Sequence, residues 1–198
     1  MGKIVYLMGK SSTGKDTIFK RLLEDDGLKL KNIVPYTTRP RRDGEKDGEE
    51  YFFTDEEKFL KLKYQGKVIE DRSSNTFHGR WRYFTVDDGQ VQLQSRNYIM
   101  IGTLEAYGKL REYFGEDRML PVMIELDDGI RLQRALNRER QQDSPKYEEM
   151  CRRFLADSVD FAEEKIHGAG IARRFCNGEL ESCLGEIRTY IMENLDAK

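Results

Sequence analysis

The chain has 198 residues, 38% of them hydrophobic and 35% charged, and its formal net charge is −2. This length suits one globular domain, and the near-zero net charge gives no general attraction to nucleic acid or to an anionic membrane, so we expect neither as a partner. The three scattered cysteines lack metal-ligand spacing and no segment is apolar enough to cross a bilayer, which favours a reducing, cytoplasmic setting.

The first predicted elements are a buried strand, a glycine-rich loop and a helix. Residues 4–8 form an apolar run rich in β-formers, and residues 16–23 carry an apolar stripe at helical spacing. Between them, "GKSSTGK" fits the phosphate-loop pattern G-x-x-x-x-G-K-[ST], except that an aspartate stands where a hydroxyl residue is expected. The predicted nucleotide-phosphate site comprises Gly9, Lys10, Ser11, Ser12, Thr13, Gly14, Lys15, Asp16 and Thr17.

The remaining elements alternate between strand and helix. Strands are expected at 31–36, 67–72, 98–101, 120–126 and within 172–178. Helices are expected at 56–64, 104–114, 127–140, 147–166 and 180–195. Residues 73–84 are expected to be a loop that contains several aromatic residues. This alternation predicts an α/β fold with a parallel sheet, and no linker divides the chain.

The chemistry of the loop follows from its residue types. Backbone N–H groups in a glycine loop, and the positive end of the next helix, bind phosphate oxygens. Lys15 is expected to reach the β- and γ-phosphates, and the Asp16 carboxylate to hold magnesium directly or through water. Thr17 is expected at the α-phosphate, because one step along a helix rotates a side chain by about 100°. The alternative is an ordinary glycine turn with Asp16 in the first turn of a helix.

A second motif, "TTRPRRDGEKDGEEYFF", is much more specific. With "GKSSTGK", "VIE" ending at Glu70, "RALNRER" and "NGEL" beginning at Asn177, it makes most of the chain resemble the guanylate kinases, a family of P-loop nucleoside monophosphate kinases. The resemblance implies a P-loop NTPase-type three-layer fold and a single domain over 1–198. Its core would be 1–34 and 86–198, with a lid near 131–153, and 35–85 would be an inserted acceptor-binding subdomain.

The resemblance also implies a reaction and its residues: ATP and GMP give ADP and GDP with magnesium, in a monomer or homodimer. Catalytic roles would fall to Lys15, Arg39, Arg138 and Arg153, and the magnesium ligand would be Asp16. Besides the phosphate loop, ATP would be bound by Arg134, Arg138 and Asn177. GMP would be bound by Thr38, Arg39, Arg42, Tyr51, Glu70, His78, Gly79 and Thr103.

These roles suit the residue types. Forked guanidinium groups at Arg39 and Arg42 match a phosphate, and lid arginines can neutralise the charge of the transferring phosphoryl group. A carboxylate at Glu70 can accept from guanine N1–H and its 2-amino group together, a pair that adenine lacks. The alternatives are a solvated basic loop, a strand-end glutamate and helix-surface ion pairs that occupy some of the lid arginines.

Several positions depart from the family pattern. Asp16 replaces a hydroxyl residue, Pro35 a serine, His78 a tyrosine and Thr103 an aspartate. Arg80 likewise stands at a hydroxyl position. These departures leave two other functions open. The first is a kinase like ribose 1,5-bisphosphate phosphokinase, which resembles this chain in the G-K-D of its loop. The second is a non-catalytic guanylate-kinase-like binding module, which Lys15 argues against.

Overall fold

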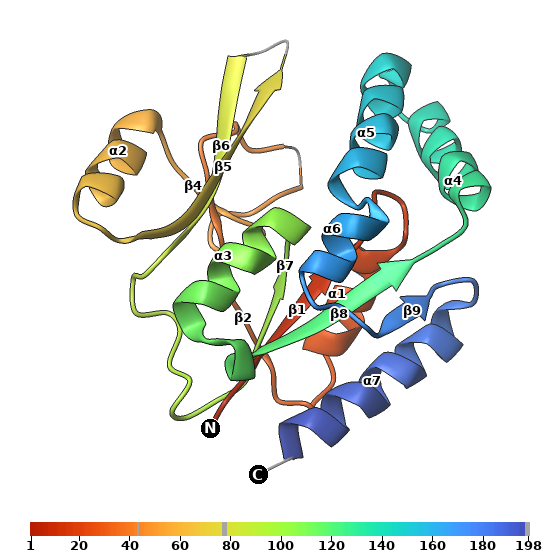
Figure 1. Cartoon of the computed structure of the whole chain (residues 1–198). Helices are drawn as coiled ribbons and strands as arrows, with labels where there is room; N and C mark the ends of the chain where they lie inside the picture. The colour runs from red at the N-terminus through yellow and green to blue at the C-terminus, as the bar shows by residue number, and fades with distance from the viewer. Residues whose placement is uncertain (43, 77–78, 197–198) are drawn as a thin grey trace.

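The computed structural model describes residues 1–42, 44–76 and 79–196, and the structural statements below concern these residues (Figure 1). The strands are β1 (Ile4–Met8), β2 (Lys31–Asn32), β3 (Tyr36–Thr37), β4 (Phe52–Phe53), β5 (Val68–Thr76), β6 (Gly79–Val86), β7 (Tyr98–Ile101), β8 (Met119–Glu125) and β9 (Arg174–Cys176). The helices are α1 (Lys15–Leu23), α2 (Glu56–Tyr64), α3 (Leu104–Phe114), α4 (Asp128–Arg140), α5 (Tyr147–Asp160), α6 (Glu163–Gly168) and α7 (Leu180–Asp196), with a 3₁₀ turn η1 (Glu116–Arg118).

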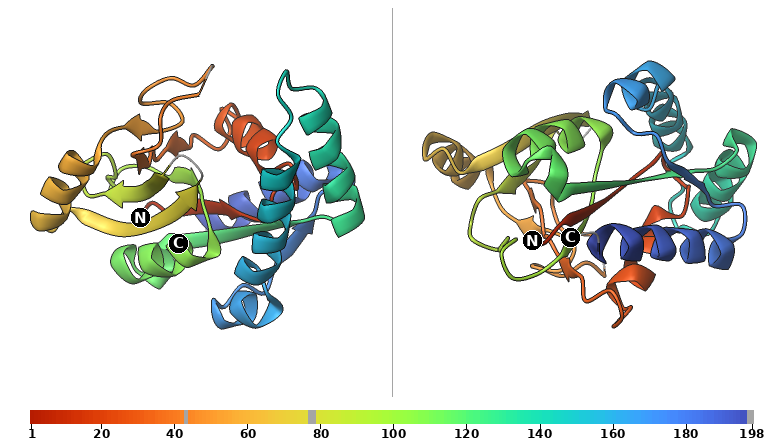
Figure 2. Two further views of the ribbon diagram at one scale, coloured as in Figure 1. Left: turned by 90° about the horizontal axis from the view of Figure 1, so that it is seen from above. Right: turned by 60° about the horizontal axis from the view of Figure 1, so that its bottom comes forward.

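The main sheet has the strand order β2-β7-β1-β8-β9, and every pairing in it is parallel, which confirms the predicted parallel α/β core. Helices α1 and α7 cover one face of this sheet, and α3 lies on the other (Figure 2). Both faces are therefore buried, which explains why the central strand β1 is an unbroken apolar run.

Side chains of β1 alternate between two hydrophobic clusters. Val5 and Leu7 pack with residues of α1 and α7, such as Ile18 and Ile187. Ile4, Tyr6 and Met8 pack with α3 and with the segment around α6; their partners include Leu104, Tyr107, Leu110, Phe161 and Ile166. This period of two is what a strand requires. Because both faces of β1 are packed, the phosphate loop that follows it starts from a fixed position at the carboxyl end of a buried strand.

A second sheet, of order β4-β3-β6-β5, lies between β2 and β7 in the sequence. Its strands β5 and β6 form a long antiparallel hairpin. Helix α2 packs on this sheet through Phe59, whose ring lies 4.9 Å from that of Phe84, and these two residues form a small cluster with Val86. The chain thus holds a separate small unit at the place predicted for acceptor binding, although the division at 35 and 85 stays a prediction.

The predicted loop at 73–84 is wrong. Its described residues continue β5 and form most of β6, and the pairing runs in register from Ser73 opposite Arg82 to Thr76 opposite Gly79. Serine and asparagine are poor strand formers, so the isolated segment gave no strand signal. Pairing with the arginine- and aromatic-rich second strand overrides that weak preference.

Two further segments are broken where a continuous element was predicted. The strand at 31–36 divides into β2 and β3, because the backbone of Val34 bonds to the Gln90 side chain and the following Pro35 has no N–H. The helix at 147–166 divides into α5 and α6 at Phe161, which leaves helical geometry (φ −113°, ψ 38°) and enters the core. The short strand β4 was not predicted at all.

Candidate active site

The phosphate loop joins β1 to α1, and its two glycines are required by their surroundings. Gly14 has φ +87°, and a β-carbon there would collide with Nδ2 of Asn177. This Nδ2 donates a 2.7 Å hydrogen bond to the carbonyl oxygen of Thr13. A β-carbon on Gly9 would likewise collide with the carbonyl oxygen of Ile124. The loop is therefore packed against β8 and the turn after β9, and Asn177 supports it directly.

The ligand-facing part of the loop carries uncommitted polar groups. Ser12 lies in the left-handed region (φ +65°), and its buried hydroxyl has no hydrogen-bond partner among the described residues. Lys15 begins α1, and Asp16 and Thr17 are exposed in its first turn. No hydrogen bond or ion pair within the described chain engages the side chains of Lys15 and Asp16. These groups are free to meet a phosphate and its metal ion.

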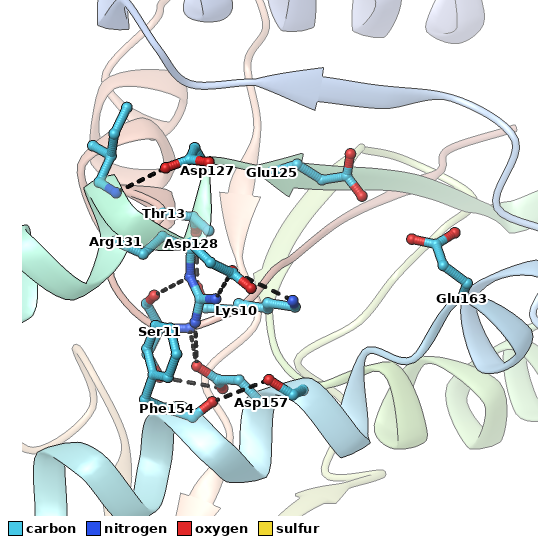
Figure 3. Close-up of polar contacts among 12 residues, drawn as sticks. Lys10, Ser11, Thr13, Glu125, Asp127, Asp128, Arg131, Phe154, Asp157 and Glu163 are labelled. Atoms are coloured by element: carbon cyan, nitrogen blue, oxygen red, sulfur yellow. Dashed lines mark hydrogen bonds and ion pairs between the residues drawn. The ribbon is translucent and has the colours of Figure 1, made fainter.

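A network of hydrogen bonds and ion pairs connects the phosphate loop to helices α4 and α5 (Figure 3). Arg131 of α4, 0% exposed, donates from Nε to the carbonyl oxygen of Ser11 at 2.9 Å. Its Nη1 bonds Asp128, and its Nη2 donates to Oδ2 of Asp157 on α5 at 2.7 Å. The same Asp157 oxygen accepts from the backbone N–H of Ser11 at 2.7 Å, and the Phe154 ring lies 4.8 Å from the guanidinium carbon of Arg131. Here, "the anchor" denotes Ser11, Arg131 and Asp157.

The predicted lid arginines lie beyond the anchor on α4 and α5. Arg134 and Arg138 are exposed and one turn apart, so they share a face of α4. Arg134 lies beside the phosphate loop, since its Nη1 would be 3.9 Å from a β-carbon on Gly14. Arg153 lies 3.9 Å from Glu139 and 3.6 Å from Glu149, so the helix ion-pair alternative holds for this residue.

On the acceptor side, Arg39 is 3% exposed and already bonded. Its Nη2 donates to Glu45 at 2.7 Å, and its Nη1 donates to the carbonyl oxygen of Pro40 at 2.8 Å. Burial alone would raise the pKa of Glu45, but bonds from Arg39 and from the backbone N–H of Arg42 hold it below its ordinary value. The guanidinium of Arg39 lies 5.5 Å from the ring centre of Tyr51, so two of the predicted phosphate-binding residues are in contact.

Glu70 is the most constrained acid in the second sheet. It is 4% exposed; Oε1 accepts from the Thr85 hydroxyl at 2.8 Å, and Oε2 has no partner among the described residues. Burial raises the pKa of Glu70 above its ordinary value, while the nearby charge of Arg72 opposes that rise. A buried carboxylate oxygen without a donor is costly, so this geometry favours a ligand that supplies one.

The other predicted acceptor-binding residues differ in exposure and in their hydrogen-bond partners. Thr38 Oγ1 accepts from the backbone N–H of Arg82 at 2.9 Å, and Gly79 is the exposed first residue of β6. Thr103 caps α3 and accepts from Nη1 of Arg72 at 3.0 Å. His78 lies outside the described residues. Roles in acceptor binding stay predictions for all of them.

A cavity of about 780 Å³ separates the two sides of the site. Its walls come from the phosphate loop, the β5–β6 hairpin, α3, α5 and the segment around α6; they include Ser11, Arg72, Tyr83, Thr103, Arg153 and Asp157. Of the predicted site residues, Ser11, Thr103 and Arg153 line this cavity. Its lining does not include Lys15, Arg39, Arg42, Tyr51 or Glu70.

Comparison with known proteins finds similarity to guanylate kinases. A family model described as guanylate kinase matches residues 1–84. Guanylate kinase of Porphyromonas gingivalis is 28% identical over 197 residues, 98% of each chain. The chain is thus similar to guanylate kinases along almost its whole length. Guanylate kinase of Mycoplasma mobile is 34% identical over 128 residues, which are 63% of this chain and 61% of that protein.

The fold is also that of a solved guanylate kinase. The crystal structure of guanylate kinase from Anaplasma phagocytophilum matches with a TM-score of 0.69 at 18% identity, over 100% of this chain and 88% of that one. In the part of the chain that the structure describes, no helix is long and apolar enough to span a bilayer.

Sequence patterns had not singled out some residues of this site. Glu45 lay unmarked within the acceptor motif, and Arg131 and Asp157 meet only in the folded chain. Arg72 carried a usable signal, because it stands two residues after Glu70 in a predicted strand and must share its face.

Proposed function

We propose that the protein transfers the γ-phosphoryl group of ATP to GMP, giving ADP and GDP. The unpartnered Oε2 of Glu70 carries the acceptor assignment, since a carboxylate with one free oxygen suits the paired donors of guanine. The relatives from Mycoplasma mobile and Porphyromonas gingivalis are both guanylate kinases, which supports the same reaction.

On the donor side, the loop amides, Lys15 and the Ser12 hydroxyl would hold the triphosphate. Arg134 beside Gly14 would cover it, and Asn177 would keep the loop in shape. Arg39, Arg42 and Tyr51 would hold the acceptor phosphate on the far wall. Such a site needs no side-chain nucleophile, because alignment of the two phosphates and neutralisation of their charge supply most of the acceleration.

Magnesium would be held mainly by ATP. Within the described residues no group of three or more carboxylate, histidine or cysteine side chains could hold a metal. Asp16 is exposed at the mouth of the phosphate loop and suits a single carboxylate ligand, the number typical of magnesium in kinases. When bound, the ion would offset the charge of the phosphates.

Replacing Asp16 with serine should reduce the dependence of ATP binding on magnesium by roughly tenfold, because one negative charge beside the triphosphate is removed. Calorimetric titration of ATP with and without magnesium measures this dependence as the ratio of the two dissociation constants. Asp26→Ser, at an exposed acid beyond the far end of α1, is the matched control. A ratio equal to that of the wild type would exclude Asp16 from the metal site.

Replacing Glu70 with glutamine should reduce the preference for GMP over AMP, measured as kcat/KM, by roughly 10- to 100-fold. The same change should stabilise the free protein at neutral pH. Burial raises the pKa of Glu70, so the stability that its protonated form confers is lost as the pH rises through the folded-state pKa. Glutamine stays neutral, so the gain over wild type should grow from acidic to neutral pH in thermal unfolding.

Glu57→Gln, an exposed acid of α2 in the same unit, serves as the control for both measurements and should change neither. An unchanged GMP preference in Glu70→Gln would mean that Glu70 does not recognise the base.

Turnover of magnesium-ATP with a panel of GMP, AMP, UMP and ribose 1,5-bisphosphate tests the proposed reaction directly. Turnover of GMP alone is expected. Turnover of ribose 1,5-bisphosphate instead of GMP would show that the acceptor is a sugar phosphate. Turnover of none of the four compounds would favour a non-catalytic binding module. We place the reaction in the cytoplasm, where the free thiols of Cys151, Cys176 and Cys183 would stay reduced.

A further inference from the structure

Arg72 occupies a central place in the cavity between the donor and acceptor walls. It lies two residues from Glu70 on β5 and opposite Tyr83 on β6, whose ring centre is 5.5 Å from its guanidinium carbon. Its Nη1 donates a 3.0 Å hydrogen bond to the hydroxyl of Thr103 at the start of α3. Contacts with β6 and with the start of α3 therefore hold the guanidinium at the cavity wall.

Arg72 has no ion-pair partner within the described chain, although the carboxyl group of Glu70 lies near enough for their charges to interact. The one hydrogen bond of Arg72 goes to a neutral hydroxyl, and no described carboxylate lies within ion-pair distance. Two other arginines of the same unit are paired, Arg39 with Glu45 and Arg82 with Glu56 and Asp71. A guanidinium has five N–H donors. Because Arg72 is half-buried and has no anionic partner in the described chain, we expect its guanidinium to bind an anion from a ligand.

The neighbours of Arg72 indicate which anion. The cavity places it with Ser11 of the phosphate loop and Arg153 of α5, where the two sets of phosphates would meet. Burial raises the pKa of Tyr51, and Arg72 is the leading charge that opposes this rise. Arg72 thus acts on a residue expected to contact the acceptor phosphate, while two donors of Arg39 are spent on Glu45 and Pro40.

We propose that Arg72 binds the phosphate group of the acceptor nucleotide, beside Arg39 and Arg42. This inference rests on the proposed function, and it adds a binding residue that the sequence motif does not contain. The guanidinium of Arg72 would compensate for the charge that Glu45 removes from the acceptor site.

Calorimetric binding of GMP and of guanosine to the wild type, Arg72→Ala and Arg72→Lys tests this inference. Arg72→Ala should weaken GMP binding roughly 10- to 100-fold, the loss typical of a charge-assisted hydrogen bond, and weaken guanosine binding much less. Arg72→Lys should recover part of the loss for GMP, because it keeps the charge without the fork. Arg188→Ala, which removes a surface arginine paired with Asp25, should behave as wild type.

The outcomes separate the inference from the function on which it rests. Wild-type protein that binds neither GMP nor guanosine would overturn both. Wild-type binding of GMP with no effect of Arg72→Ala would overturn the inference alone. Equal losses for GMP and guanosine would also overturn it, because they would place Arg72 at the base or ribose. Thermal unfolding of each variant shows whether a loss of binding reflects a loss of fold.

Discussion

Replacing Lys15 with alanine is expected to lower kcat for GMP phosphorylation by roughly 10³-fold or more. The lysine stands at the first position of α1, directly after the loop, and makes no ion pair with the described residues. Its ammonium charge is therefore available to the phosphates that change charge during transfer. Alanine is the best helix former, so α1 and the fold should be kept. Steady-state ADP release with saturating ATP and GMP measures the effect.

Lys20→Ala is the matched control, since it removes the same charge from the exposed face of the same helix. It should leave kcat within a factor of about two, because exposed charges far from a site contribute little. Near-normal turnover in Lys15→Ala would show that the phosphate loop does not bind the transferred phosphoryl group. The acceptor residues would then need another donor site.

Replacing Asp157 with alanine is expected to destabilise the protein by about 3 kcal/mol, near the lower end for breaking a buried ion pair. The change leaves Arg131, which is 0% exposed, with Asp128 and the Ser11 carbonyl as its remaining polar partners. It also removes the acceptor for the backbone N–H of Ser11, so the phosphate loop should loosen and KM for ATP should rise. Urea unfolding and ATP kinetics measure the two effects.

The double variant Arg131→Leu/Asp157→Ala should be less destabilised than the sum of its two single variants, because it leaves no unpaired buried charge. Arg188→Ala breaks an exposed pair with Asp25 of similar geometry and should cost less than about 1 kcal/mol. Additive losses at Arg131 and Asp157 would mean that the two residues stabilise the fold independently and that the anchor is not a unit.

Local pattern was enough to predict the donor half of the molecule. β1, the phosphate loop and α1 are contiguous, and their signals of burial, glycine spacing and helical period agree with one another. The acceptor half was predicted less well. β6 depends on pairing with β5, which local pattern does not show. Outside the acceptor half, the break at Phe161 was also missed, because it depends on a core that other segments build.

The same distinction applies to the candidate site. Gly14 and Lys15 belong to one short motif whose geometry is local. Arg131 and Asp157 are 26 residues apart and contact Ser11, 120 and 146 residues from them, so no spacing rule relates the three. The unpartnered oxygen of Glu70 is likewise a property of packing.

The second sheet has a hydrophobic cluster of its own, built on Phe59, Phe84 and Val86 and distinct from the two clusters of the main sheet. Substitutions within it need not disturb the residues that support the phosphate loop. The acceptor wall can therefore change without a change in the packing that supports the phosphate loop. Of the positions that depart from the family pattern, Pro35 and Arg80 lie in or beside this unit, where they can alter the acceptor wall without touching the residues that support ATP binding.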